Sequence, residues 1–224
     1  MLKSPFAKRS FRIPPKVTHK IELEYEIGEV DDNEVETLKL KFHLYREQCP
    51  TAVENFIHLC KGDLGNGPVS GKPLSYKNTE VHRIVPHFLV QAGDITHGNG
   101  VGGEAAISKL YFDDDPQCLK QSLFNYKYFI AVANRLKPNT NGSQFFVTAV
   151  KTRWLDHHNM LFGRLSVEDD FDDAPPDDDE TDYVENFEQL MELGSSSGKP
   201  IKPVRIRQCT VLPLSKQAAV SRQD

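Results

Sequence analysis

Two segments near the start of the chain alternate between apolar and polar residues. Residues 21–27 carry glutamates at the polar positions, and residues 38–44 carry two lysines and a histidine there. A period of two places the apolar side chains on one face of a β-strand. The polar stretch 28–33 favours a turn, so we predict a hairpin with one face on a core. Glutamates of one strand would then face lysines of the other.

The chain next changes to the period of an α-helix. Thr51 and Glu54 fit a capping box directly after Pro50, and Gly62 is typical of a helix end. We therefore predict an amphipathic helix whose inward side chains follow helical spacing: Val53, Phe56, Ile57 and Cys60.

A second helix is predicted over about 185–193. Asp182 and Glu185 form its expected cap pair, and Gly194 is its expected stop. Its inward side chains are Phe187, Leu190 and Met191.

Short apolar runs separated by Gly, Pro and Asn turns fill the rest of the chain, at 79–84, 88–91, 128–134, 144–150, 160–165 and 204–212. Many short strands with only two helices indicate a mainly β fold, an antiparallel sandwich or barrel. Closure into a barrel is favoured because it removes exposed strand edges. The absence of an internal repeat argues against a propeller or solenoid.

The net charge of −5 hides two blocks of like charge. Residues 1–20 hold six bases and no acid, whereas residues 168–182 hold ten acids and no base. Such blocks repel themselves and bury little apolar surface. We interpret 1–17 as a flexible basic arm, 18–213 as the folded domain with an acidic insertion at 168–182, and 214–224 as a flexible tail.

Several classes of protein and of site find no support. No run approaches the ~20 apolar residues of a membrane span, and the mean hydropathy is −0.49. The four cysteines lie far apart without a CxxC pair, which argues against a zinc finger or a disulfide scaffold. No GxSxG motif is present, and nothing pairs a cysteine with a particular histidine, so covalent hydrolysis is not indicated.

Three motifs suggest ligand sites and fail closer tests. The glycine-rich run 98–103 lacks the Lys-Ser/Thr of a P-loop and the strand–helix context of a dinucleotide site, so we interpret it as a tight glycine loop. His157 and His158 lack a third metal ligand at a suitable spacing. The acidic run 169–182 lacks the EF-hand glycine and glutamate. We expect no metal and no cofactor.

Polar side chains stand inside two strand-like runs. Residues 81–94 set His82, Arg83 and Gln91 among apolar neighbours, and residues 139–146 set Gln144 beside two phenylalanines. Polar groups in apolar surface need partners, and where the partner is a ligand the site is a pocket. The structural alternative makes Arg83 a surface ion-pair residue and Gln144 a hydrogen-bonding core residue. The isolated strands leave both interpretations open.

Longer motifs reveal a family resemblance. The run 82–94, the block 133–134 followed by 138–146, and the pieces 154–156 and 162–163 resemble the cyclophilin family of peptidyl-prolyl cis-trans isomerases. Residues 50–56 and 208–209 are also similar, so the resemblance spans about 20–212 in order. It implies a closed eight-stranded antiparallel β-barrel capped by two α-helices, which agrees with the periodicities above.

The resemblance also implies site residues. Arg83 matches the catalytic arginine, whose guanidinium would hydrogen-bond the proline nitrogen of a twisted amide. The implied substrate-binding residues are His82, Phe88, Leu89, Gln91, Ala133, Asn134, Gln144, Phe146, Trp154, Leu155 and Asn159. Of these, four would line the slot for the proline ring: Phe88, Leu89, Phe146 and Leu155. Gln91 and Gln144 would orient Arg83 and the substrate carbonyl, and the Asn134 backbone would hold the peptide extended.

The chain departs from the family pattern at several places. Leu89 replaces a common methionine, and Asn159 replaces a common histidine. Residues 133–138 are one residue longer than usual, with 135–137 bordering the groove. Residues 62–76 resemble the longer loop of divergent-loop members, and Cys60 with Cys209 resembles their cysteine pair, which implies reversible oxidation.

The resemblance implies an isomerase that rotates X-Pro bonds in proteins and so assists folding or conformational switching. The alternatives are a catalytically weak module that binds proline-containing peptides, favoured by Asn159 and the altered rim, and a scaffold that works through its charged arms. Expected partners are proline-containing peptides and proteins and, through Trp154, cyclosporin-type macrocycles. We expect a monomer without a membrane partner. We also expect no nucleic-acid partner, because six bases alone make only a weak electrostatic footprint.

The expected location is the cytoplasm, with the nucleus as an alternative. A mitochondrial location would require the basic arm to be a presequence, yet prolines at 5, 14 and 15 break the amphipathic helix that such a signal needs.

Overall fold

The fold begins with the predicted hairpin. The computed structural model describes residues 15–28, 35–167 and 181–214. β1 (His19–Ile27) pairs antiparallel with β2 (Glu36–Leu44) in a register that sets Glu22 opposite Lys41 and Glu24 opposite Lys39. The alternating apolar side chains of both strands are buried, as predicted.

The polar face of the hairpin differs from the prediction in one respect. Lys41 and His43 of β2 are buried, although their alternation with apolar residues predicts a solvent-facing side. The ammonium group of Lys41 lies 4.7 Å from the centroid of the Tyr183 ring. Aromatic contact from a distant element covers this position, which a local periodicity does not reveal.

The described strands form one antiparallel sheet of nine strands in the order β3-β9-β1-β2-β8-β6-β7-β5-β4. The mainly β antiparallel fold class is confirmed. The predicted strand 79–84 is divided into β3 (Thr79–Glu80) and β4 (Arg83–Val85), which raises the count from eight to nine. The other strands are β5 (Leu89–Ala92), β6 (Phe129–Val132), β7 (Phe145–Thr148), β8 (Leu161–Leu165) and β9 (Val204–Leu212). Because β3 and β4 are consecutive in the chain yet stand at opposite ends of this order, the sheet is strongly curled; within the described residues no strand pairing joins its two ends, so the predicted closure of the barrel is not complete.

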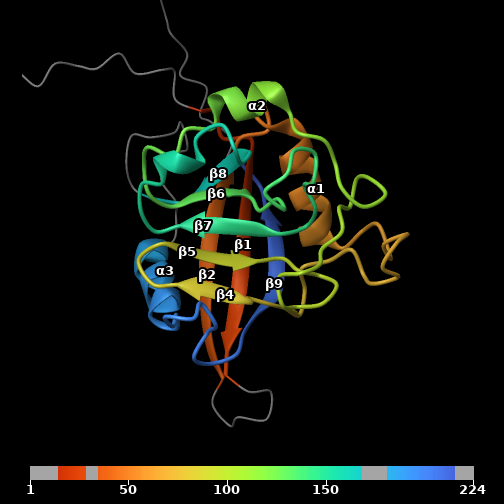
Figure 1. Cartoon of the computed structure of the whole chain (residues 1–224). Helices are drawn as coiled ribbons and strands as arrows, with labels where there is room; N and C mark the ends of the chain where they lie inside the picture. The colour runs from red at the N-terminus through yellow and green to blue at the C-terminus, as the bar shows by residue number, and fades with distance from the viewer. Residues whose placement is uncertain (1–14, 29–34, 168–180, 215–224) are drawn as a thin grey trace, which may run out of the picture.

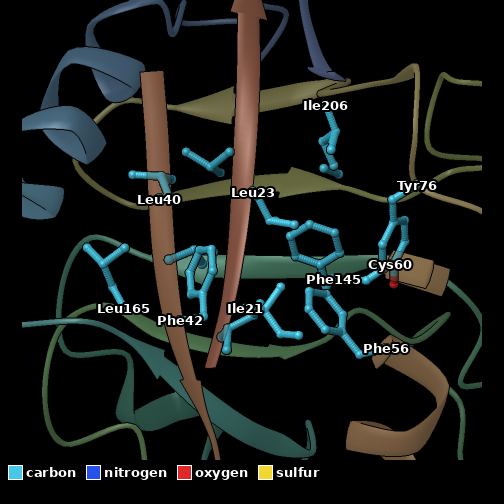
Figure 2. Close-up of a cluster of buried hydrophobic side chains, with 14 of the residues drawn as sticks. Ile21, Leu23, Leu40, Phe42, Phe56, Cys60, Tyr76, Phe145, Leu165 and Ile206 are labelled. Carbon is cyan, nitrogen blue, oxygen red and sulfur yellow. The ribbon is translucent and has the colours of Figure 1, made fainter. Parts of the chain in front are cut away.

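The curled sheet encloses the core. Figure 1 shows β1 and β2 running upright behind the stack of β4, β5, β7 and β6, which crosses them. Figure 2 shows the side chains that fill the space between these strands and α1. The ring of Phe56 lies 5.2 Å from the rings of both Tyr76 and Phe145. Contacts between aromatic rings therefore fix α1 against the curled sheet.

Helix α1 (Pro50–Lys61) buries the predicted face, with Val53, Phe56, Ile57 and Cys60 inside. It ends at Gly62 in the left-handed conformation, as predicted. The predicted capping box is wrong, because the N-cap is Cys49 and no side chain caps the helix. Pro50 is the first residue of the helix, which places Thr51 inside the first turn instead of at the cap.

Two further helices complete the described structure. α3 (Tyr183–Glu192) is capped by Asp182, whose carboxylate accepts the backbone N–H groups of Val184 and Glu185. It ends just before Leu193, close to the predicted stop, and buries the predicted apolar face. α2 (Pro116–Gln121) was not predicted, although Asp115 followed by proline is a typical helix start. A single 3₁₀ turn, η1, covers Arg153–Leu155.

The cysteines form one disulfide that the sequence did not predict. Cys49, the N-cap of α1, is bonded to Cys118 in α2, across 69 residues of chain. Cys60 and Cys209 carry free thiols. Burial raises the pKa of Cys60 well above its usual value, and a hydrogen bond with Cys209 acts in the same direction. The two cysteines paired by the family resemblance therefore lie together in the fold.

The predictions for the basic arm, the acidic insertion and the tail fall mainly on residues 1–14, 168–180 and 215–224, outside the described residues. Within the described ranges, no helix combines the length and apolar character that crossing a membrane requires. The same ranges hold no cluster of three or more residues suited to bind a metal ion.

Candidate active site

A second apolar cluster covers the outer face of the crosswise strands. Adjacent residues of a strand point to opposite faces, so Phe145 enters the main core while Phe146 points outward. Phe146 stacks on Phe124 with ring centroids 6.1 Å apart. The cluster also buries Val17, Tyr45, Leu89, Phe129, Ala131 and Leu161. Half-buried Phe88, Ala133 and Leu155 form its partly exposed edge. We call the apolar surface made by Phe88, Leu89, Phe146 and Leu155 the slot, after the proline-binding slot that the resemblance implies.

The η1 turn borders this slot. Trp154 is 63% exposed, and its ring lies 5.9 Å from that of Phe88. The backbone of Phe124 makes two hydrogen bonds to the residues that flank the turn. Its carbonyl accepts the Thr152 N–H at 3.0 Å, and its own N–H donates to the Asp156 carboxylate at 2.7 Å. Trp154 therefore presents an exposed aromatic face on a turn anchored by the segment after α2.

A row of polar side chains begins where the slot ends. Arg83 on β4 lies opposite Gln91 on β5, and Gln91 lies opposite Phe146 on β7. Directly opposed residues of antiparallel strands project from the same face. The Nη1 group of Arg83 lies 3.4 Å from Oε1 of Gln91, and Nε2 of Gln91 donates to Oε1 of Gln144 at 2.9 Å. The exposed guanidinium is thus held beside the apolar slot.

The glycine loop 98–103 holds the other end of this row. Nε2 of Gln144 donates to the carbonyl of Gly100 at 2.9 Å and to that of Gly102 at 2.8 Å. The interpretation of 98–103 as a tight loop is confirmed, since the run contains neither helix nor strand. Its carbonyls, and not its N–H groups, face the site.

Asp94 organises this loop, and sequence reasoning gave it no role. Its buried carboxylate accepts six hydrogen bonds of 2.9–3.2 Å, from the hydroxyl of Thr96 and from the N–H groups of residues 96, 97, 99, 100 and 102. Burial opposes ionisation, but the hydrogen bonds outweigh it and hold the pKa of Asp94 well below its usual value. An aspartate before a glycine-rich run is a turn signal that could have identified it.

His82 lies between the row and the loop. A Cβ added to Gly100 would come within 2.8 Å of Cδ2 of His82, and Gly100 has a φ of 89°. Only glycine therefore fits at this place in the loop. Burial lowers the pKa of His82, so its ring is neutral at pH 7. The imidazole therefore packs against the glycine loop, next to Gln144 of the polar row.

The end of β6 supplies the remaining predicted residues. The Ala133 N–H donates to the Gln144 carbonyl at 2.9 Å. The Asn134 side chain donates to the His158 carbonyl at 3.2 Å. Asn159 is buried, and its amide donates to the Val132 carbonyl at 3.0 Å. The end of β6 is therefore tied to Gln144 and to the segment after η1, and Asn159 is buried with its amide bonded to the backbone.

A pocket of about 110 Å³ adjoins the polar row. Four predicted site residues line it: Gln91, Ala133, Asn134 and Gln144. It also includes residues to which sequence reasoning gave no binding role: Gly100, Gly102, Tyr111, Arg135, Thr140 and Gly142. These come from separate loops, so their proximity depends on the tertiary fold.

Comparison with known families agrees with this arrangement. Residues 32–211 match the family model described as cyclophilin type peptidyl-prolyl cis-trans isomerase/CLD. Because the match covers most of the chain, the protein belongs to the cyclophilin family.

Proposed function

We propose that this protein catalyses cis-trans isomerisation of X-Pro peptide bonds. Rotation about such a bond crosses a barrier of about 18–20 kcal/mol, because amide resonance must be lost, while the two end states differ by only about 0.5–1 kcal/mol. No covalent bond is made or broken. A site that binds the twisted amide better than the planar one is therefore sufficient.

One observation carries the proposal: the Arg83 guanidinium is held at the edge of an apolar slot by a relay of two glutamines. When the amide twists, the lone pair of the proline nitrogen localises and becomes a better hydrogen-bond acceptor. A permanently charged donor there stabilises the transition state more than the ground state. About 3 kcal/mol of such preference corresponds to a rate gain of roughly a hundredfold.

The apolar slot would bind the proline ring. Leu89 and Phe146 form its buried floor, while Phe88 and Leu155 form its half-buried rim. An apolar ring gains free energy from this burial, and the slot holds it while the preceding carbonyl swings. The substrates implied by family membership are proline-containing peptides and proteins.

One observation favours the alternative of a binding module with little turnover. Asn159 stands where the family commonly has histidine, and its buried amide is bonded to the Val132 carbonyl, so a more polar group replaces an imidazole at this position. Such a change would weaken proline binding without removing Arg83.

Two-dimensional NMR exchange on a tetrapeptide containing an Ala-Pro bond separates these functions. Catalysis predicts exchange cross-peaks between the cis and trans signals at a low ratio of protein to peptide. A binding module predicts chemical-shift changes on titration without added exchange. Absence of both effects would contradict the proposed function and the alternative together.

A further inference from the structure

Arg135 is one of the residues that line the pocket beside the polar row. Its Nη2 group donates to the Val101 carbonyl, and its guanidinium lies 5.6 Å from the centroid of the Tyr111 ring. The Arg135 N–H donates to the Thr140 hydroxyl at 3.1 Å, which in turn donates to the Lys137 carbonyl at 2.7 Å. Loop 133–140 is thus hydrogen-bonded internally and tied to the glycine loop by one charged side chain.

Among the described residues, the side chains that line this pocket carry positive charge and no negative charge. Its lining holds one permanent cation, the Arg135 guanidinium, and, as far as the structure describes the chain, no acidic side chain. The carbonyls of Gly100 and Gly102 each accept one hydrogen bond from the Gln144 amide, which uses part of their acceptor capacity. A guanidinium has five N–H donors, of which the Val101 carbonyl takes one. The pocket therefore offers donors to an incoming anion.

We infer that Arg135 and Tyr111 make this pocket selective for a carboxylate side chain of the substrate, an Asp or Glu two residues from the proline. The inference rests on the proposed function and names the substrate class. In an extended peptide, side chains two residues apart point the same way, about 6.5–7 Å apart. The pocket and the slot share the Gln91–Gln144 row, so a peptide with proline in the slot sends such a neighbour to the pocket.

The volume and the donors of the pocket suit the side chain of Asp or Glu. A volume of about 110 Å³ is several times what one water molecule requires. Carboxylates bind guanidinium through two parallel hydrogen bonds, and the Tyr111 face keeps the guanidinium plane in place. Substrates with lysine at the same position would meet like charge and be disfavoured.

The test compares matched peptides with Glu, Gln or Lys placed two residues before or two residues after the proline. Their affinities are measured by NMR titration and their isomerisation by exchange spectroscopy. At one of the two positions, Glu should bind roughly threefold to tenfold better than Gln. Increasing salt should reduce this ratio, because the pair is partly exposed.

Substitution of Arg135 should abolish the preference. In Arg135→Gln the ratio of the affinities for the Glu and Gln peptides should fall to about one. In Arg135→Glu the Lys peptide should bind better than the Glu peptide. Tyr111→Leu should reduce the ratio while the charge is retained. Lys137→Gln is the matched control: it removes one charge from the same loop outside the pocket lining and should keep the ratio of the wild type.

The outcomes separate the two claims. Equal affinity for Glu and Gln at both positions, or an acid preference that survives Arg135→Gln, would overturn the inference even if isomerisation is fast. An acid preference in binding without any catalysed exchange would support the pocket assignment and contradict the proposed catalysis. If Arg135→Gln loses its folded NMR spectrum, the Tyr111→Leu ratio decides, and an unchanged ratio there would overturn the inference.

Discussion

Gln91 donates its side-chain amide to Oε1 of Gln144 at 2.9 Å, and this contact sets which atom of Gln91 faces Arg83. The Gln144 amide nitrogen is taken by two loop carbonyls, so its oxygen must face Gln91. The Gln91 nitrogen is then used, and its oxygen is left for the guanidinium. The direction of each hydrogen bond is thus imposed from the glycine loop to Arg83.

Reversing this polarity should impair catalysis. Gln144→Glu preserves shape but replaces the only donor with an acceptor that faces two carbonyls. We expect kcat/KM to fall by about tenfold, since the loss of a buried charged or polar partner costs about 1–3 kcal/mol. Gln208→Glu on β9, an exposed position away from the site, is the matched control. Equal kinetics in the two variants would show that the relay does not position Arg83.

Asp94 should stabilise the loop in a way that depends on pH. Asp94→Asn replaces one acceptor oxygen by an NH₂ group facing three backbone N–H groups. We expect a loss of about 2–4 kcal/mol in the free energy of unfolding at pH 7, measured by urea denaturation. Because the folded pKa is depressed, the contribution of the wild-type carboxylate is complete above the unfolded value of about 3.9 and declines below it.

The difference between wild type and Asp94→Asn should therefore be constant from pH 7 to about 5 and narrow below about 4. A difference that grows on acidification would contradict the assignment of a strongly hydrogen-bonded carboxylate.

The Cys49–Cys118 disulfide should contribute measurably to stability. It closes a loop with a sequence separation of 69, for which the chain-entropy relation gives about 4 kcal/mol. The double variant Cys49→Ala/Cys118→Ala should unfold at lower urea concentration than the oxidised wild type. Thiol titration of the unfolded, unreduced protein should count the two free cysteines, 60 and 209. Four reactive thiols before reduction would contradict the disulfide.

Asn159 is the departure from the family pattern that changes polarity, whereas Leu89 in the slot replaces methionine with another apolar side chain. In Asn159→His the ring N–H can still donate to the Val132 carbonyl, while the imidazole adds apolar surface behind the proline. We expect a several-fold gain in kcat/KM and tighter binding of cyclosporin-type macrocycles, measured by calorimetry. If neither changes in a folded variant, Asn159 does not influence the slot.

The sequence predicted those parts of the fold that depend on local periodicity. The strands at 21–27 and 38–44, the faces of α1 and α3, and the Asp182 cap all follow from spacing within one element. The capping box failed because Pro50 begins the helix one residue before Thr51. Burial of Lys41 depends on Tyr183, which is distant in sequence, so no local pattern could reveal it.

The site was predictable only in part, because several of its contacts join residues that are distant in the sequence and leave no local pattern. Arg83, Gln91 and Gln144 stand out because polar residues interrupt apolar strands. The sequence pattern did not reveal that the Asp94 carboxylate binds the N–H groups of the glycine loop. It also did not reveal the contact of the Arg135 guanidinium with the Tyr111 ring, because those two residues lie in separate segments of the chain. The Cys49–Cys118 pair likewise joins two helices whose approach the sequence does not specify.

The central claim is that Arg83 stabilises the twisted amide, and NMR exchange on the Ala-Pro peptide tests it most directly in Arg83→Ala. Arg207→Ala is the matched control, because Arg207 is an exposed arginine on β9 that pairs with Glu24 and does not belong to the site. The account predicts at least a tenfold fall in the catalysed exchange rate for Arg83→Ala, with peptide affinity within about threefold of wild type and no change for Arg207→Ala. An unchanged exchange rate in folded Arg83→Ala would contradict it.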